Sequence, residues 1–348
     1  MKKIRALALV SGGLDSLLAA KVIETQGIEV QGISFQIGFT KEEFGIPQRD
    51  KNKKGDDNGG HLNPQYYADK AGIKLNIENI FEEFKSVLVN PKHGYGSNMN
   101  PCIDCKAFML HKAKEYMEKH GFDFLVTGEV LGQRPMSQRK QALPIVAKEG
   151  GVEDIVLRPL CAKLLPETLP ERNGWVDREK LYDFNGRGRK SQVELAKQLG
   201  VTEYPQPAGG CLLTDPGFSK RLENLWQSKC EKEYSVDEIK LLSIGRHLRF
   251  CDQFKLIISR EKAETEYMEQ FYGQFTMLKA LDYGGPVGLI DGDADQKEVK
   301  KAAAILARYG SGRDAPEVKV EVFEVSGEKM VYTVVPYSAE QISPSWHI

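Results

Sequence analysis

A glycine-rich hexapeptide near the start of the chain constrains its fold most: Ser11-Gly12-Gly13-Leu14-Asp15-Ser16. It follows an apolar stretch of strand length, residues 4–10, and precedes a run of good helix formers, residues 14–26. A glycine-rich turn between a strand and a helix directs backbone N–H groups to the positive end of the helix dipole. The glycines permit close backbone approach and the serines can add hydroxyl donors. Although any such turn can carry these residues, the order predicts a phosphate-binding loop.

The hexapeptide resembles the pyrophosphate loop of the ATP pyrophosphatases, the PP-loop enzymes that adenylate a carbonyl oxygen and release pyrophosphate. This resemblance implies that ATP is a substrate, that Mg²⁺ neutralises its phosphates, and that Asp15 positions the metal or the loop. The other common phosphate loop, G-x-x-x-x-G-K-[ST], is absent because the chain contains no Gly-Lys dipeptide. Kinase-like transfer of a γ-phosphoryl group is therefore disfavoured.

Strand and helix patterns alternate through the first 130 residues, which predicts an α/β fold with a doubly wound parallel sheet. The expected strands are 4–10, 29–35, 74–78 and 123–127, and the expected helices are 14–26, 64–72 and 104–120. Ligands of such sheets bind outside the carboxyl ends of the strands. We therefore expect the loop to meet two further groups of ATP-binding residues, which are Ser34, Phe35 and Gln36 at the end of the second strand, and Thr127 and Gly128 at the end of the fourth.

The chain of 348 residues is long for a single core, and its pattern changes along its length. We expect residues 1–234 to form a PP-loop ATP-binding catalytic domain, in which 131–234 elaborate the substrate side. The alternation of helices and strands restarts near residue 236, so residues 235–348 should form a smaller α+β domain. The charged, glycine-rich stretch 38–63 is interpreted as a long polar loop.

Composition describes an ordinary globular chain, with 41% hydrophobic residues and a net charge of −1. The chain as a whole lacks the excess of positive charge that indicates a nucleic-acid partner. No apolar run approaches the ~20 residues that span a bilayer, so we expect a cytoplasmic protein without a membrane partner. Six cysteines in such a chain favour metal binding, redox chemistry or catalysis over a disulfide framework.

Two cysteines, Cys102 and Cys105, stand at the start of an expected helix, and Cys211 follows two glycines farther along the chain. A helix N-terminus lowers the pKa of a thiol, which favours both metal ligation and nucleophilic attack. Three thiolates would hold three irons of a [4Fe–4S] cluster and leave the fourth iron open. This arrangement resembles the cluster-dependent tRNA thiolases of the PP-loop family, in which the open iron is thought to carry the transferred sulfur.

Two other interpretations of these cysteines stay open. In the cluster-free 2-thiouridine synthases a nucleophilic cysteine bears a persulfide and a second cysteine completes release, roles that Cys105 and Cys211 would fill here. The pair could also be a zinc site or have no chemical function, although a structural zinc usually needs four ligands. Cys161, Cys230 and Cys251 are interpreted as small core residues.

The segment Thr127-Gly128-Glu129-Val130-Leu131-Gly132-Gln133 is similar to a Thr-Gly-Glu-x-Leu-Gly-Gln stretch of the 4-thiouridine synthetases. Glu129 or Gln133 could orient an acceptor near the reacting phosphate. Arg158, which ends an expected fifth strand, could pair with a phosphate of ATP or RNA. A strand end, a turn cap and a surface salt bridge are the structural alternatives for these residues.

The carboxyl-terminal domain resembles the RNA-binding module of ribosome quality-control factors, in the stretch that contains Arg246, His247 and Arg249. Basic residues interleaved with Leu248 and Phe250 can provide phosphate contacts and a stacking ring. The competing interpretation is an ordinary strand with a basic edge.

Together these features predict an ATP-dependent tRNA sulfurtransferase that adenylates a uridine carbonyl oxygen and replaces it with sulfur. Its expected partners are tRNA and a sulfur donor, either sulfide or a persulfide carrier, and a homodimer is a candidate assembly. One alternative is a PP-loop amidotransferase or ligase acting on a small molecule, which would leave the cysteines unexplained. Another is a non-catalytic RNA-binding iron–sulfur protein, which the intact loop disfavours.

Overall fold

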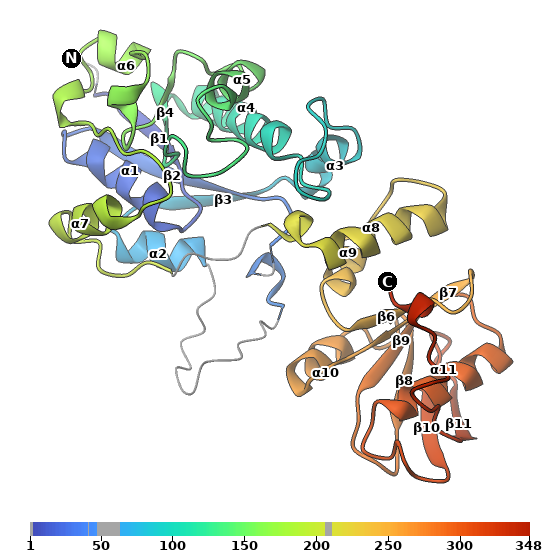
Figure 1. The fold of residues 1–348 in the computed structure, drawn as a ribbon. Coiled ribbons are helices and arrows are strands. Elements are labelled where there is room, and N and C mark those ends of the chain that lie inside the picture. The colour runs from blue at the N-terminus through green and yellow to red at the C-terminus, as the bar shows by residue number, and fades with distance from the viewer. Residues whose placement is uncertain (1–2, 41, 47–62, 206–210) are drawn as a thin grey trace. The chain divides into compact units, whose positions relative to one another are not determined.

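The structure is a computed structural model that describes residues 3–40, 42–46, 63–205 and 211–348 (Figure 1). Most of the expected polar stretch 38–63, and the two glycines before Cys211, lie outside the described residues. The chain divides into two compact units, the first formed by Met1–Gly38 with Lys53–Cys211 and the second by Phe39–Asn52 with Leu212–Ile348.

The first unit is built on a parallel sheet of five strands in the order β3-β2-β1-β4-β5. The strands are β1 Arg5–Leu9, β2 Glu29–Gln36, β3 Leu75–Asn79, β4 Phe124–Thr127 and β5 Val156–Leu157. The order reverses at β1, so the loop after β1 lies at the topological switch point where α/β sheets bind ligands. The expected α/β fold with a doubly wound parallel sheet is confirmed.

Helices cover both faces of this sheet (Figure 1). They are α1 Leu14–Glu24, α2 Pro64–Lys70, α3 Phe81–Val89, α4 Cys102–His120, α5 Ala142–Glu149, α6 Leu169–Arg172 and α7 Lys190–Gln198. Successive side chains of a strand point to opposite faces. Ala6 and Ala8 accordingly join the buried cluster of α1 and α7, whereas Leu7 joins that of α4 and α5. This packing holds the turn between β1 and α1 at the edge of the sheet where the strands have their carboxyl ends.

The second unit is an antiparallel sheet of six strands in the order β11-β10-β8-β9-β7-β6, which confirms the smaller α+β domain. Its strands are β6 Arg246–Leu248, β7 Phe254–Ile258, β8 Thr276–Ala280, β9 Val287–Gly292, β10 Val318–Phe323 and β11 Lys329–Val334. Its helices are α8 Pro216–Lys229, α9 Val236–Leu242, α10 Lys262–Glu269 and α11 Gln296–Arg308. One cluster packs α11 against the sheet, and a second packs α9 and α10 against Ile257 and Leu289.

The described part of the stretch 38–63 differs from a solvated polar loop. Phe39 and Ile46 are buried. The ring of Phe39 packs edge-on against Phe218 and Tyr234, with centroids 6.2 and 5.9 Å apart. Ile46 joins the core cluster of α9 and α10. These apolar residues follow β2 in the chain and pack in the core of the second unit. The second unit is therefore built from two separate segments, Phe39–Asn52 and Leu212–Ile348.

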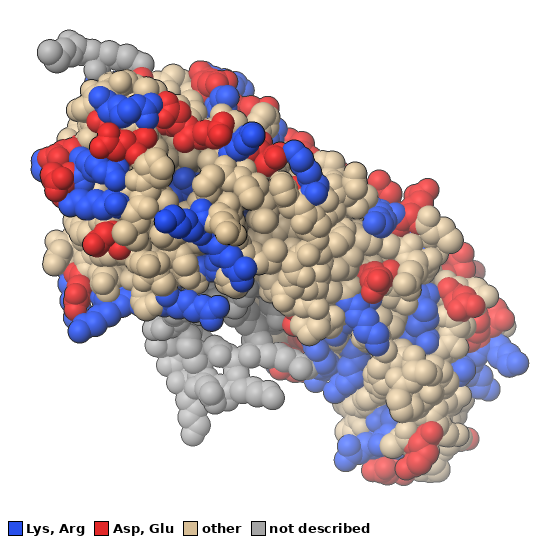
Figure 2. All heavy atoms as spheres, turned by 45° about the horizontal axis from the view of Figure 1, so that its top comes forward, with Lys and Arg blue, Asp and Glu red and all other residues tan. Residues whose placement is uncertain are grey.

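The division into units falls between residues 211 and 212, and it assigns α8 to the second unit. The boundary expected between 234 and 235 stays a prediction about where the catalytic part ends. Acidic and basic side chains are interspersed on the surface in Figure 2, in keeping with the net charge of −1. Among the described residues, no helix is both long and apolar enough to span a bilayer.

Candidate active site

The hexapeptide forms the turn between β1 and α1, and hydrogen bonds inside it fix its shape. The Ser16 hydroxyl donates to the Gly13 carbonyl at 2.7 Å and accepts from the Ser11 N–H at 3.2 Å. Gly13 is the N-cap of α1 and supplies no side-chain acceptor. The first N–H groups of a helix lack the usual partner four residues earlier, which makes the start of α1 a place where an anion can bind, although the Ser16 N–H already donates to the Gly13 carbonyl at 3.1 Å.

Two glycines in this region allow contacts that no other residue would permit. Gly12 has φ +76°, and a Cβ there would lie 2.8 Å from Cα of Pro64, the first residue of α2. A Cβ on Gly128 would lie 2.5 Å from the backbone C and O of Asp15. Real Cβ contacts are not this short, so the end of β4 can approach the loop this closely only if residue 128 is glycine.

A cavity of about 160 Å³ opens at the carboxyl ends of β1, β2 and β4. It is lined by most of the residues expected to bind ATP, namely Ser11, Gly13, Asp15, Ser16, Ser34, Phe35, Thr127 and Gly128. Three others lie outside the lining. Gly12 packs on α2, Leu14 belongs to the buried core below the loop, and the carbonyl of Gln36 accepts a hydrogen bond from Ile80.

Asp15 receives two donors on one carboxylate oxygen. Gln133 Nε2 donates to Asp15 Oδ2 at 2.6 Å, and Arg189 Nη2 donates to the same atom at 3.2 Å. Gln192 Nε2 in turn donates to Gln133 Oε1 at 3.3 Å. Asp15 Oδ1 is buried and has no hydrogen-bond partner among the described residues. A carboxylate oxygen in this state, beside a phosphate-binding turn, is a suitable ligand for Mg²⁺.

Glu129 and Arg158 form a buried ion pair behind the cavity. Arg158 Nε donates to Glu129 Oε2 at 2.9 Å, and both side chains are only 7% exposed. Glu129 lines the cavity and Arg158 does not. Glu129 Oε1 and Arg158 Nη2 are buried without a hydrogen-bond partner among the described residues. The pair is thus not the surface salt bridge considered as an alternative, and Arg158 contacts Glu129 from outside the cavity lining.

Three cations that sequence reasoning did not single out line the cavity: Lys106, Arg134 and Arg189. Lys106 and Arg134 form no ion pair with any described residue, so their charges are available to a ligand. Arg189 precedes α7 within a basic loop, where the local pattern indicated only a flexible turn. Lys106 and Arg134 directly follow residues of the predicted motifs and Arg189 does not, so only the fold shows that the three side chains meet at one cavity.

The first turn of α4 carries Cys102 and Cys105 on the helix face that reaches the cavity. Residues four apart share a helix face, which aligns Cys102 with Lys106 and Cys105 with Met109, and both of these partners line the cavity. The Cys102 thiol donates to the Ser137 hydroxyl at 3.3 Å, and the neighbouring Gln138 also lines the cavity. The two thiols and the nucleotide cavity therefore occupy one side of α4.

The described residues do not form the ligand set that a cluster requires. Among them, no group of three or more His, Cys, Asp or Glu side chains could hold a metal ion. Cys211 is half-buried and belongs to the first unit. Of the other cysteines, Cys161 is buried and burial raises the pKa of its thiol to about 11, as expected of a core residue. Cys230 is exposed, so its assignment to the core is wrong.

The three basic residues expected to contact RNA differ in accessibility. Arg249 Nε donates to Asn224 Oδ1 at 2.9 Å and its Nη1 to the Asp252 carbonyl at 3.0 Å, while burial lowers the pKa of its guanidinium. His247 is buried. Arg246 lines a large surface pocket of the second unit. Of the three, Arg246 is the one placed to meet a ligand in that pocket.

Two family models match separate parts of the chain. Residues 2–163 match the family model described as "Thiamine biosynthesis protein (ThiI)". Residues 245–347 match the model described as "NFACT protein RNA binding domain".

Curated relatives include the tRNA-specific 2-thiouridylase MnmA of Acetivibrio thermocellus, which is 28% identical over 268 residues. The tRNA-specific 2-thiouridylase MnmA 1 of Clostridium botulinum strain Loch Maree is 31% identical over 264 residues. Each alignment covers 71% of this chain and 66% of the relative, so the chain spans just under two thirds of their length.

A solved 4-thiouridine synthetase–RNA complex with bound ATP aligns with 68% of this chain and 52% of its own, at 17% identity and a TM-score of 0.36. The C-terminal part of the fibronectin/fibrinogen-binding protein from Streptococcus suis aligns with 46% of this chain and 72% of its own, at 13% identity and a TM-score of 0.27. The family-model matches confirm both expected resemblances: residues 2–163 resemble the ThiI family, and residues 245–347 resemble the RNA-binding domain of NFACT proteins.

Proposed function

We propose that the chain is an ATP-dependent tRNA sulfurtransferase, which adenylates a uridine carbonyl oxygen and replaces that oxygen with sulfur. The observation that carries the proposal is the arrangement along α4, whose cysteine-bearing first turn shares a helix face with side chains of the nucleotide cavity. The matches to ThiI, to MnmA relatives and to an RNA-binding domain support it.

ATP would bind in the cavity with its phosphates on the turn before α1. The helix N-terminus and the hydroxyls of Ser11 and Ser16 would hold the pyrophosphate part. Lys106 and Arg134 would neutralise it, since neither forms an ion pair with a described residue. Asp15 Oδ1 would bind Mg²⁺, which supplies charge neutralisation during phosphoryl chemistry. Ser34, Phe35, Thr127 and Gly128 would then surround the nucleoside part.

Activation begins when the uridine carbonyl oxygen attacks the α-phosphorus of ATP and pyrophosphate leaves. Glu129 lines the cavity with one oxygen that accepts no hydrogen bond from a described residue, and would orient the base. Gln133 contributes indirectly by fixing Asp15. Adenylation converts a poor leaving oxygen into one that departs as AMP, so that a sulfur nucleophile can take its place on carbon.

The chain's own cysteines can perform the second half. A persulfide on Cys105, transferred from a persulfide carrier, would attack the activated carbon through its terminal sulfur and expel AMP. The Cys211 thiolate would then attack the inner sulfur, which releases the thiolated base and leaves a Cys105–Cys211 disulfide. A dithiol reductant is needed to restore both thiols. A helix N-terminus favours the thiolate form, and Cys105 lies in the first turn of α4.

The [4Fe–4S] cluster on Cys102, Cys105 and Cys211 stays a prediction, and no step above depends on it. The described residues do not present a metal-binding group. Iron and acid-labile sulfide measured on anaerobically purified protein test it directly. The cytoplasmic location and the homodimer likewise remain predictions.

The decisive experiment incubates the purified chain with unmodified tRNA, ATP, Mg²⁺, a dithiol reductant and a persulfide carrier, with sulfide as the donor in a parallel reaction that tests the cluster route. Mass spectrometry of the digested tRNA should reveal a thiolated uridine, and AMP and pyrophosphate should accumulate in parallel. Cys105→Ala should abolish thiolation while Cys230→Ala, at an exposed helix end, should not. Release of AMP without a thiolated nucleoside under any sulfur donor would overturn the proposal and favour a PP-loop ligase.

A further inference from the structure

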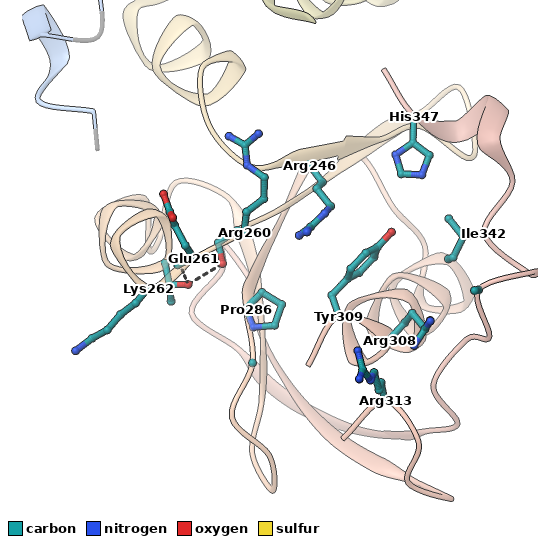
Figure 3. Close-up of a pocket in the computed structure, with 14 residues that line it drawn as sticks. Arg246, Arg260, Glu261, Lys262, Pro286, Arg308, Tyr309, Arg313, Ile342 and His347 are labelled. Atoms are coloured by element: carbon teal, nitrogen blue, oxygen red, sulfur yellow. Dashed lines mark hydrogen bonds between the residues drawn. The ribbon is translucent and has the colours of Figure 1, made fainter. Parts of the chain in front are cut away.

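The second unit carries a surface pocket of about 690 Å³, a volume within the range of ligand sites (Figure 3). It lies between β6, the start of α10, the end of α11 and the carboxyl-terminal segment. Five basic residues line it, with Glu261 as the one carboxylate of the lining: Arg246, Arg260, Lys262, Arg308 and Arg313. We call this the arginine–tyrosine pocket, because Tyr309 lies at its centre.

The five basic side chains are not equivalent. The charged ends of Arg260 and Lys262 point away from Tyr309, whereas that of Arg246 points toward it (Figure 3). Arg260 is also held by two oxygens of Glu264, which is buried. The guanidinium carbon of Arg246 lies 4.9 Å from the centre of the Tyr309 ring.

The cations around Tyr309 are weakly neutralised. Arg246 forms no ion pair with a described residue. Arg313 meets Asp314 at 3.5 Å, but both side chains are more than 60% exposed, and such surface pairs contribute little. The pKa of the Glu340 carboxyl is lowered mainly by a hydrogen bond from Ser338, and the positive charge of Arg308 lowers it further. A polyanion can therefore displace these contacts at low cost.

Arg308 ends α11, and the segment from there to Arg313 is hydrogen-bonded to the connection between β8 and β9. Ser311 donates to the Gly284 carbonyl through both its N–H and its hydroxyl, each at 2.8 Å. Gly310 approaches Gly285 so closely that a Cβ on Gly285 would lie 3.1 Å from the Gly310 Cα. An ordered main chain between Arg308 and Arg313 lowers the conformational entropy that is lost when the two residues bind a ligand.

We propose that the arginine–tyrosine pocket binds an unpaired nucleotide of the tRNA substrate. Arg308 and Arg313 contact its backbone phosphates, while its base stacks in the pocket against the Tyr309 side chain and the guanidinium plane of Arg246. Stacking on an aromatic ring or an arginine requires a base that is free of its helix, which is why the site selects an unpaired nucleotide. The choice of RNA rests on the proposed function and on the RNA-binding model that covers all four residues.

The test measures binding of full-length protein to fluorescently labelled tRNA by anisotropy across a salt series. Arg308→Gln and Arg313→Gln should each weaken binding and reduce the slope of log K against log salt by about 0.7–0.9, the value for one lost phosphate contact. Tyr309→Leu should weaken binding about 10-fold or more with the slope unchanged, and Tyr309→Phe should bind as the wild type does. Lys300→Gln, which removes an exposed charge from α11 outside the pocket, is the matched control.

Equal affinity and slope in the arginine variants and in Lys300→Gln would overturn the proposal. So would saturation of the pocket by inorganic phosphate or uridine monophosphate without competition against tRNA. An unpaired RNA oligonucleotide should compete better than a duplex of the same length. Thermal unfolding of each variant confirms that the second unit is folded. Thiolation is measured separately: a wild-type chain that binds through this pocket but never thiolates tRNA contradicts the proposed function and leaves the pocket intact.

Discussion

Arg189 Nη2 lies 3.2 Å from Asp15 Oδ2, although 174 positions separate the two residues in the chain. The contact exists because α7 packs against α1 and directs the residue before its first turn over the phosphate-binding loop. Gln192 on the same turn supports it through Gln133, which donates to the same Asp15 oxygen. One oxygen of Asp15 is thus held by the protein while the other has no partner among the described residues.

Replacing Arg189 tests whether this contact prepares the loop for ATP. Arg189→Gln removes a charge-assisted hydrogen bond to Asp15 and a cation of the cavity. Such bonds contribute about 1.5–3 kcal/mol, which predicts a rise of about 10- to 100-fold in the KM for ATP. Arg187→Gln, an exposed neighbour that does not line the cavity, should leave KM unchanged. Steady-state release of pyrophosphate measures both, and equal KM values would show that Arg189 is only a surface cation.

The close approach of β4 to the loop predicts that Gly128 tolerates no side chain. Gly128→Ala would place a Cβ 2.5 Å from the backbone of Asp15, so the loop must shift. Overpacking of this kind costs about 1–3 kcal/mol, and we expect a lower Tm together with loss of ATP binding by calorimetry. At Gly188 a Cβ would meet nothing within 4 Å, so Gly188→Ala should change neither quantity. Normal ATP affinity in Gly128→Ala would contradict the described geometry.

We predict that removing one partner of the buried Glu129–Arg158 pair destabilises the protein more than removing both charges does. Arg158→Met leaves the Glu129 carboxylate buried without its counter-charge, a change that typically costs about 3–5 kcal/mol. Arg158→Met combined with Glu129→Gln should recover most of that stability and still lack activity, because Glu129 faces the cavity. Urea unfolding and nucleoside analysis separate the two effects. A double variant as unstable as the single one would mean that the pair is not coupled.

Sequence reasoning placed the elements of the first sheet well because their signals are local. Strand 29–35 was expected and β2 runs Glu29–Gln36; helix 104–120 was expected and α4 runs Cys102–His120. The turn between β1 and α1 depends on adjacent glycines and serines, so it too could be predicted. Helices α3, α5 and α8 were not expected, although the buried apolar residues of α3 and α8 do follow helical spacing.

What could not be predicted depends on partners distant in sequence. Arg189 lies in a basic, glycine-rich loop, and nothing nearby indicates that its partner is Asp15. Phe39 and Ile46 stand in a polar stretch, and their burial is set by residues about 200 positions later. A consequence is that deletion of residues 236–348 would remove the core partners of Ile46 as well as the proposed RNA-binding surface. Point substitutions therefore test RNA binding more cleanly than truncation.

His247 gives the second unit a pH-dependent stability. The ring is buried, with Nε2 2.9 Å from the Ile244 carbonyl and 3.1 Å from that of Leu241. Burial lowers the pKa of His247 well below its ordinary 6.5, and the charges of Arg221 and Lys255 lower it further. Below pH 6.5 the His247 imidazole is therefore protonated in the unfolded chain but stays neutral in the folded one. This contribution to stability is fully present above pH 6.5 and declines as pH falls.

We expect the free energy of unfolding to decrease by up to about 1.4 kcal/mol per pH unit below 6.5 from this one group. His247→Gln keeps a donor for the two carbonyls but does not titrate, so its profile between pH 7.5 and 5 should be flatter than that of the wild type. His347→Gln, at an exposed ring in the same unit, should retain the wild-type slope. Urea unfolding at each pH, followed by tryptophan fluorescence, measures the three profiles. Parallel profiles for all three chains would mean that carboxyl groups, and not the buried imidazole, govern the acid sensitivity of this unit.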